Sequence, residues 1–307
     1  MNPVLIIGGA HIDRKGAMET DYIIGASIPG TIEEVVGGGA FNVAANLSRL
    51  GSKVTFISPR ADDTNSIKVA NAIKPLSICD KSVFCEGSTP SYTALIDRHG
   101  ELVAALADMK LYDNLSSEAF LKDDVITELK NCGILITDAN LPEDVLVQIS
   151  QTISEDCHWY AIAVSPAKVK RYLPVIERID CLAMNMNEAK AITNRSNSSD
   201  FSELRKSLDQ LRLRGAIITN GADEIIAYLD GLEHITLKPK TVDDVADVTG
   251  AGDATLSGFV SIIEASGGIK QALEFGITAA RLTIAIKGAQ HPLLTSDLVL
   301  KELEQNQ

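Results

Sequence analysis

The sequence predicts one α/β domain, in which a doubly wound, mostly parallel sheet is flanked by helices and carries a small antiparallel β lid. Three observations lead to this prediction. Short apolar runs alternate with helical patterns along most of the 307 residues, as is typical of a parallel sheet covered on both faces. Two pairs of short strands, at about 17–36 and 91–107, interrupt that alternation. No linker divides the chain, so the lid is expected to be inserted in a single domain spanning residues 1–307.

The predicted strands of the main sheet are apolar runs, and helical patterns follow or precede most of them. The strands are Val4–Ile7, Val54–Ser58, Ile134–Thr137, Trp159–Val164, Cys181–Met184 and Ala216–Thr219. The helices are Ala40–Leu50, Glu143–Ser150, Val169–Ile176, Asn187–Thr193 and Leu204–Leu213. A hairpin of Glu224–Leu229 and Leu232–Leu237 is expected at the sheet edge. The C-terminal third is expected to be helical over Ala251–Glu264, Ile269–Lys287 and Asp297–Glu304.

Two hairpins predict the lid. Tyr22–Ile24 and Thr31–Val36 flank a Pro-Gly turn, and Ser91–Asp97 and Leu102–Ala107 flank the turn at 98–101. Four short antiparallel strands of this kind form a flap that can close over a ligand and exclude water. A fixed extension of the sheet edge is the alternative.

The composition excludes some functions. The chain has 28 Lys and Arg against 41 Asp and Glu, a net charge of −13, which argues against a broad basic face for nucleic acid but not against a phosphorylated ligand. The five cysteines are odd in number and contain no C-x-x-C pair, so reduced thiols in a cytoplasmic protein are expected. No signal-peptide pattern and no apolar run of membrane-spanning length occurs, so no membrane partner is expected.

The most informative stretch is Asp-Val-Thr-Gly-Ala-Gly-Asp at 247–253, directly before a helical pattern. Small residues at a helix start leave the first N–H groups free, and the helix dipole adds to their attraction for an anion. Asp253 stands where a base could take a proton from a nucleophile that attacks this anion. The pattern favours phosphoryl transfer to a hydroxyl, and a plain glycine-rich helix start is the alternative.

Three further segments follow predicted strands or precede predicted helices. Asp13, with His11 beside it, comes after the first strand, where ligands bind in doubly wound sheets, or it caps a turn. Gly37–Asn42 contains three glycines that permit close approach to a ligand, or it is an ordinary helix start. Asn185-Met-Asn-Glu188 can order a hydrated Mg²⁺, or Asn185 caps the next helix.

Thr219-Asn-Gly221 offers a hydroxyl and bare backbone for a nucleotide, or forms a simple turn. The order of these motifs along the chain resembles that of the ribokinase-like carbohydrate kinases, and this resemblance covers nearly the whole sequence. Segments 6–16 and 91–109 resemble those members of the family that phosphorylate pseudouridine. The resemblance implies an ATP-dependent kinase that uses Mg²⁺ and, in many members, potassium. It also implies a homodimer, because the lid sheet often pairs in this family.

The resemblance implies a role for each matching residue. Asp253 is the general base, and Gly250, Ala251 and Gly252 form the anion hole together with Thr249. The acceptor is held by His11, Asp13, Gly38, Asn42, Tyr92 and Asp108. The nucleotide is bound by Asn185, Thr219, Gly221 and Thr249. Glu188 holds Mg²⁺ through water, and Asp247 and Thr249 hold a monovalent cation.

The sequence departs from the family pattern at four places. Ala40 replaces a glycine, Glu224 replaces the last glycine after Thr219, His11 replaces an asparagine, and the usual Asp-Pro is changed around Val164–Pro166. None of these changes removes the base or the anion hole. The resemblance therefore implies ATP-dependent phosphorylation of the 5′-hydroxyl of pseudouridine. Ribose, adenosine, and inosine or guanosine are the alternative acceptors. A catalytically inactive sugar-binding regulator is a further alternative, whereas a dehydrogenase would require a glycine fingerprint that is missing after the first strand.

Overall fold

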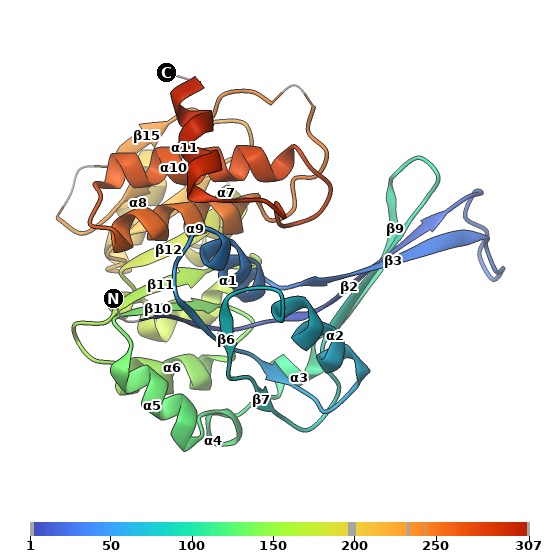
Figure 1. Ribbon diagram of the computed structural model, residues 1–307, viewed down its shortest axis with the longest axis horizontal. Coiled ribbons are helices and arrows are strands. Elements are labelled where there is room, and N and C mark those ends of the chain that lie inside the picture. Colours follow the sequence, from blue (N-terminus) through green and yellow to red (C-terminus); the bar gives the residue numbers. More distant parts are fainter. Residues whose placement is uncertain (1–2, 196–200, 232–233, 243, 306–307) are drawn as a thin grey trace.

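The computed structural model describes residues 3–195, 201–231, 234–242 and 244–305. Its main sheet has the strand order β15-β14-β13-β12-β11-β10-β1-β4-β6 (Figure 1). The parallel strands are β6 (Ile78–Asp80), β4 (Val54–Ile57), β1 (Val4–Ile7), β10 (Ile134–Asp138), β11 (His158–Ile162), β12 (Cys181–Asn185) and β13 (Ala216–Thr219). The antiparallel strands β14 (Ile225–Tyr228) and β15 (Ile235–Leu237) complete one edge.

Helices cover both faces of this sheet, because successive strand residues point to opposite sides. In β1, Leu5 and Ile7 belong to one core cluster, and Val4 and Ile6 belong to the other. The second cluster lies under α1 (Gly39–Arg49), α2 (Thr64–Ile73), α9 (Ala251–Glu264) and α10 (Ile269–Ile284). The first lies under α5 (Asp123–Asn131), α6 (Glu143–Thr152), the 3₁₀ helix η1 (Val169–Arg178), α7 (Met186–Ile192) and α8 (Phe201–Gln210). The α/β class and the two-sided sheet are thus confirmed.

The smaller elements complete the body. Helix α11 (Ser296–Gln305) packs on α10 through Phe275, Ala279 and Val299. The remaining short elements are α3 (Lys110–Asp113), α4 (Ser117–Phe120), and the paired strands β5 (Pro59–Arg60) and β7 (Val83–Phe84). None of the helices in the described ranges is long and apolar enough to cross a membrane.

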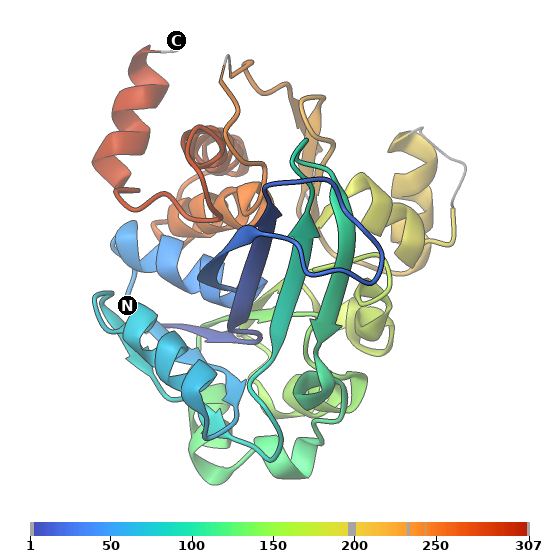
Figure 2. The ribbon, with the colours of Figure 1, turned by 90° about the vertical axis from the view of Figure 1, so that its right-hand side faces the viewer.

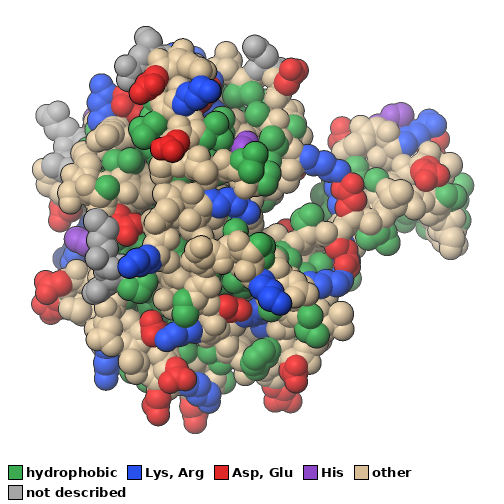
Figure 3. Space-filling model, in the orientation of Figure 1, with side chains coloured by type: hydrophobic (Ala, Val, Ile, Leu, Met, Phe, Trp, Pro, Cys, Tyr) green, Lys and Arg blue, Asp and Glu red, His purple; other side chains and the backbone are tan. Residues whose placement is uncertain are grey.

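The lid is a separate four-stranded sheet that projects from the body (Figures 1 and 2). Its order is β3 (Gly30–Gly37), β2 (His11–Met18), β8 (Ser91–Ile96) and β9 (Leu102–Asp108). In the space-filling view a notch separates the outer part of the lid from the body (Figure 3). A lid of this size and position was predicted, but two of its details were wrong.

The first error concerns strand direction, because β2 and β8 pair in parallel and the sheet is mixed rather than antiparallel. Both strands leave the body in the same direction, which makes their pairing parallel. The second error concerns the boundaries. The lid begins at His11, not near residue 17, and Tyr22–Ile24 lies in the connection between β2 and β3. Asp13 therefore lies within a strand and not in a loop.

Other boundaries differ for local reasons. The predicted helix Val169–Ile176 is a 3₁₀ helix that contains Pro174, whose ring nitrogen has no hydrogen to donate. Helix α10 ends at Ile284, three residues before the predicted end at Lys287, because the following residues form the loop described below. The predicted strand Leu232–Leu237 begins outside the described residues, and its described part is β15.

Candidate active site

The loop before α9 is shaped by Gly250. This residue is the N-cap of α9 and has φ of 77°, in the left-handed region that other residues rarely adopt. A β-carbon at Gly250 would come within 2.0 Å of the carbonyl oxygen of Ala289. Only glycine therefore lets the loop 285–290 pack against the start of α9. This packing fixes the direction in which the first amides of the helix point.

The first turn of α9 presents an anion site. The N–H groups of Gly252 and Asp253 have no acceptor within the helix, because no helical carbonyl lies four residues earlier. Gly252 is exposed, and a β-carbon built on it would meet no atom within 4 Å. The space in front of these amides is therefore open. With the dipole of the 14-residue helix behind it, this terminus suits a phosphate group.

Asp253 stands beside this anion site. Its Oδ2 accepts a hydrogen bond of 2.8 Å from Nδ2 of Asn42 on α1. Burial raises the pKa of Asp253 to about 7, against the effect of the Asn42 hydrogen bond, and the charges of Asp138 and Glu188 add to the rise. A carboxyl group with a pKa near neutrality is suited to accept a proton at physiological pH. The predicted base and anion hole thus lie together at one helix start.

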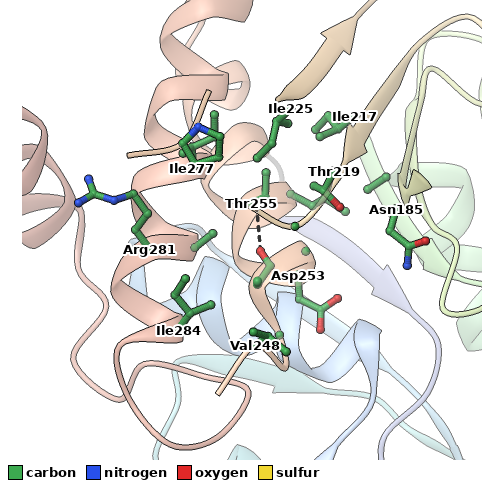
Figure 4. A pocket seen from close by; sticks show the side chains of 18 of the residues that line it. Asn185, Ile217, Thr219, Ile225, Val248, Asp253, Thr255, Ile277, Arg281 and Ile284 are labelled. Atoms are coloured by element: carbon green, nitrogen blue, oxygen red, sulfur yellow. Dashed lines mark hydrogen bonds between the residues drawn. The ribbon is translucent and has the colours of Figure 1, made fainter. Parts of the chain in front are cut away.

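A cavity of about 590 Å³ lies against this helix turn, and Gly250, Gly252 and Asp253 are among the residues that line it (Figure 4). Asp253 lies at its lower end in that view, and Asn185 lies on the side of β12. Most of the wall is apolar, from strands β13 and β14, the segment 239–248 and helix α10. The apolar lining includes Ile217, Ile225, Val242, Val245, Val248, Ile277 and Ile284. A largely apolar cavity that reaches an anion site is suited to a nucleotide base followed by its phosphates.

Three of the four predicted nucleotide residues line this cavity, and Thr249 is not among its lining residues. Thr219 ends β13, Gly221 follows it in a turn, and Asn185 ends β12. The structure shows that Asn185 caps α7, because its Oδ1 accepts from the amides of Asn187 and Glu188 at 2.9 and 3.0 Å. The structural alternative for this motif is therefore present. Asn185 thus caps α7 and also lines the cavity.

Glu188 forms a capping box with Asn185 at the start of α7. Its Oε2 accepts from the amide of Asn185 at 2.7 Å, and the side chain lines the cavity although the residue is only 6% exposed. Burial raises the pKa of Glu188, while hydrogen bonds with Asn185 oppose the rise. One carboxylate oxygen is thus held by the helix start. The described residues contain no cluster of three His, Cys, Asp or Glu side chains that could bind a metal directly. A water-mediated contact to Mg²⁺ fits a single carboxylate of this kind.

Asp247 forms a turn with Thr249. Its Oδ1 accepts from the amide of Thr249 at 2.9 Å, and its Oδ2 accepts from the amide of Gly288 at 3.2 Å. Burial tends to raise the pKa of Asp247, but hydrogen bonds from Thr249 and Gly288 outweigh burial and lower it. The carboxylate therefore stays ionised and joins the turn at 247–249 to the loop after α10.

The predicted acceptor residues meet where the lid joins the body. His11 Nε2 lies 3.3 Å from Asp13 Oδ1 in β2, and the Asp13 carboxylate lies across Gly37 of β3, where a β-carbon would come within 2.0 Å of it. Tyr92 of β8 is in register with Asp13, so both side chains lie on the same face of the lid. Gly38 is the N-cap of α1, the helix that carries Asn42.

Asp108 is set apart from this group. In the register of the lid it pairs with Ser91, the residue before Tyr92, so its side chain lies on the opposite face from Asp13. Asp108 is also exposed. The structure thus brings together the other predicted acceptor residues and leaves Asp108 outside their face of the sheet.

The sequence analysis missed Asp138. This carboxylate is fully buried at the end of β10 and accepts hydrogen bonds from the amides of Gly9 and Ala40, each at 3.0 Å. It also accepts from the amide and the side chain of Asn140. Nζ of Lys168 donates to Oδ1 of Asn140 at 2.7 Å and brings a positive charge to the network. The sequence contained a signal for this site, because Asp138 and Asn140 follow the predicted strand Ile134–Thr137 at the edge of the sheet where ligands bind.

The loop after α10 was missed as a functional segment. Four consecutive residues each contact a different part of the site. Lys287 pairs with Glu33 of the lid at 2.7 Å, and Gly288 binds Asp247. Ala289 packs on Gly250, and Gln290 donates to Oδ1 of Asn42 at 2.9 Å. These contacts join positions that are about 40 to 250 residues apart, for example 254 for Lys287 and Glu33, so no local pattern announced them.

This fold and site define a carbohydrate kinase. The chain belongs to the pfkB family of carbohydrate kinases, whose family model matches residues 1–296. Members of this family use ATP to phosphorylate an alcohol group of a sugar or nucleoside. The expected membership among ribokinase-like kinases is therefore confirmed.

Individual relatives refine the comparison. Pseudouridine kinase of Escherichia coli K12 is 26% identical over 266 residues, which cover 84% of this chain and 82% of the relative. A carbohydrate kinase from Agrobacterium tumefaciens superposes with a TM-score of 0.87 at 39% identity, over 99% of this chain and 97% of that one. Arabidopsis thaliana ribokinase, solved with ribose and ATP, has a TM-score of 0.86 at 20% identity and covers 99% of both chains. At that identity the last comparison supports the fold alone.

Proposed function

We propose that this kinase transfers the γ-phosphoryl group of ATP to the 5′-hydroxyl of pseudouridine, which yields pseudouridine 5′-phosphate and ADP. The kinase chemistry is supported by one observation above all. The Asp253 carboxylate stands between the open anion site of α9 and the start of α1. The choice of pseudouridine is supported by segments 6–16 and 91–109 and by the similarity to the Escherichia coli enzyme.

In the proposed reaction the acceptor oxygen attacks the γ-phosphorus while the bond to the β-phosphate oxygen breaks. Asp253 takes the proton of the hydroxyl. The amides of the Gly250–Asp253 turn stabilise the charge on the transferred group, so catalysis rests mainly on positioning and electrostatics. Closure of the lid would keep water from the phosphate.

The nucleotide is assigned to the cavity beside the start of α9. In the proposal the base lies against the apolar wall, and Thr219, Gly221 and Asn185 lie beside the phosphates or ribose. Thr249 lies next to the anion site as a further contact. Mg²⁺ would be held through water by Glu188, whose second oxygen is not used in the capping box, and would neutralise phosphate charge. A monovalent cation, potassium in many members of the family, is assigned to Asp247 and Thr249, because the ionised carboxylate lies partly exposed there.

The acceptor is assigned to the junction of lid and body. Asp13 can accept two hydrogen bonds from a ribose diol, with His11, Gly38, Asn42 and Tyr92 around it. Asp108, from the opposite face of the sheet, would reach this acceptor only through a change at the end of β9.

A second copy of the chain is the proposed partner of the lid. The face opposite to Asp13 carries the side chains of Ile32 on β3, Leu95 on β8 and Leu106 on β9, and β2 lies between the first two of these strands. Ile32 and Leu106 are 75% and 73% exposed. Apolar surface of this kind favours association, and a homodimer is proposed. The five cysteines are free thiols, and the proposal places the enzyme in the cytoplasm.

A panel of acceptors tests the proposal. ATP consumption is measured with pseudouridine, uridine, ribose, adenosine, inosine and guanosine, and the Asp253→Asn variant serves as the control for contaminating kinases. The expected result is the highest kcat/KM with pseudouridine. Preference for another acceptor would replace pseudouridine and leave the kinase chemistry intact. Ligand-dependent thermal shifts without ATP turnover would favour a sugar-binding regulator.

A further inference from the structure

Three hydrogen bonds connect Asp253 to an arginine. Nδ2 of Asn42 donates to Oδ2 of Asp253 at 2.8 Å. Nε2 of Gln290 donates to Oδ1 of Asn42 at 2.9 Å. Nη1 of Arg49 donates to Oε1 of Gln290 at 3.0 Å. The chain of bonds thus starts at the last residue of α1, passes through the loop after α10, and returns to the first turn of α1.

The direction of these bonds is set by chemistry. A guanidinium group can only donate hydrogen bonds, whereas an amide side chain has one end that donates and one that accepts. Arg49 therefore holds the oxygen of Gln290, which leaves the NH₂ group of Gln290 for Asn42. Asn42 must then present its oxygen to Gln290 and its NH₂ group to Asp253.

We propose that Arg49 and Gln290 are positioning residues that fix the amide of Asn42 so that it donates to Oδ2 of Asp253. This inference rests on the proposed role of Asp253 as the base. With Oδ2 occupied by Asn42, Oδ1 is left to accept the proton of the acceptor hydroxyl. Nδ2 of Asn42 keeps a second hydrogen for the substrate. Neither Arg49 nor Gln290 touches the reacting atoms in this arrangement.

Without the hydrogen bond from Gln290, nothing in the relay would stop the side-chain amide of Asn42 from rotating by half a turn. Its side chain is 5% exposed, so water cannot easily replace a lost partner. If the amide turned over, its oxygen would face the carboxylate of Asp253, and two acceptors would lie together without a proton between them. This orientation would cost more free energy than the loss of one hydrogen bond, because it also leaves a buried polar group of Asn42 without a partner. A fixed orientation therefore matters for the ionised base.

Charged groups around Asp253 come from each neighbouring element. Asp138 follows β10, Glu188 lies on α7, and both oppose its ionisation. Arg281 of α10 lines the cavity, but its guanidinium points away from Asp253 in Figure 4 and lies 3.7 Å from Glu302. Arg49 lies at the end of α1, next to His291, whose pKa is lowered by burial and by the charge of Arg49. Arg49 is connected to Asp253 only through Gln290 and Asn42.

Two substitutions at Gln290 test the direction of the relay. Gln290→Glu keeps the size and the contact with Arg49, but a carboxylate can only accept, so Asn42 must turn its NH₂ group away from Asp253. Gln290→Leu removes the contact and adds no charge. The expected order of kcat is wild type, then Gln290→Leu, then Gln290→Glu, with a loss of about ten- to one-hundred-fold in the last. The acidic limb of the pH profile should move up by about one unit.

Substitutions of Arg49, at the opposite end of the relay, provide a matched set of variants. Arg49→Met should lower kcat in the same direction as Gln290→Leu, and Arg49→Lys, which can still only donate, should restore most of the rate. Arg178→Met is the control, because Arg178 also donates to a neighbour, the carbonyl of Ser154, but lies outside the site. Melting temperatures are measured for all variants. A merely structural role predicts that Gln290→Glu, with a new ion pair to Arg49, is both stable and fully active.

Asp253→Asn is assayed in parallel so that the two levels of inference can be separated. If Asp253→Asn turns over like the wild type, the proposed base is wrong. If Asp253→Asn is inactive while Gln290→Glu keeps the kcat, KM and pH profile of the wild type, only the relay is overturned. A smaller loss of kcat in Gln290→Glu than in Gln290→Leu would also overturn the relay, because it would show that the direction of the hydrogen bonds does not matter.

Discussion

Oδ2 of Asp138, at the end of β10, accepts a hydrogen bond of 3.0 Å from the amide of Ala40 in the first turn of α1. The N-cap of this helix is Gly38, which has no side chain that could accept a hydrogen bond from the first amides of the helix. Asp138 therefore caps a helix from another element and ties it to the sheet. Asn42 follows Ala40 by two residues, so this contact determines where Asn42 stands relative to Asp253.

The first prediction concerns this cap. Asp138→Asn must place an NH₂ group against backbone N–H donors, because Oδ1 and Oδ2 each accept at least one hydrogen bond. We expect a loss of about 1–3 kcal/mol in the free energy of unfolding. Urea denaturation followed by circular dichroism measures it. Asp156→Asn, at an exposed position, is the control, and equal midpoints for the two variants would contradict the prediction.

The second prediction concerns the base. Asp253→Asn should keep the fold and lose on the order of 10²–10⁴ in kcat, the usual contribution of a positioned general base. Steady-state kinetics with the best acceptor of the panel measures the loss. Near-wild-type turnover in a purified, folded variant would rule out Asp253 as the base.

The third prediction concerns the pH dependence of activity. The pKa of Asp253 is about 7, and only its ionised form accepts a proton. The kcat/KM of the wild type should therefore rise with pH up to about 7 and then level off. The residual activity of Asp253→Asn should lack this acidic limb. A wild-type profile that is flat from pH 5 to pH 8 would be inconsistent with the raised pKa.

The same raised pKa has a consequence for stability, with a definite sign. In the unfolded chain the carboxyl has the ordinary aspartate pKa of about 3.8, whereas in the native protein it keeps the proton up to a pKa of about 7. The native state therefore binds more protons between these values, and its stability falls as pH rises through this window. Asp253→Asn removes this dependence. Its melting temperature relative to the wild type should be higher at pH 8 than at pH 4.

The fourth prediction compares two glycines of one turn. Gly252→Ala should fold normally, because its β-carbon meets open space, but the methyl group would intrude where the phosphate is proposed to lie. Gly250→Ala should cost more than about 1 kcal/mol of stability, because of its positive φ and the clash with Ala289. Thermal unfolding and ATP turnover separate the two effects. Equal melting temperatures would contradict the packing argument.

The fifth prediction concerns the bridge between lid and body. Lys287 and Glu33 are both exposed and lie 2.7 Å apart, so solvent screening leaves the pair itself with little effect on stability. Lys287→Glu should leave the melting temperature nearly unchanged but weaken acceptor binding a few-fold, because like charges would push the lid from the body. The double variant with Glu33→Lys should restore the acceptor KM. The effect should shrink at high salt.

The sequence was sufficient for the parts of the fold that follow local rules. The hairpin at β14 and β15, the start of α9 at Ala251 and the strand–helix alternation all have periodic or turn signals, and all are confirmed. The direction of β8 beside β2 was not accessible, because strand pairing across 80 residues depends on how both leave the body. The same holds for Gln290, which meets Asn42 and Arg49 only through the tertiary fold.

The loop 287–290 places its four contacts on consecutive residues. Insertion of one amino acid there would shift the residues that follow it away from their partners. The contacts at risk are those with Glu33, Asp247, Gly250 and Asn42. Deletion of one would do the same. The length of this loop is therefore constrained more tightly than its chemistry, and engineering of acceptor preference should vary side chains on the lid while it preserves the spacing of this segment.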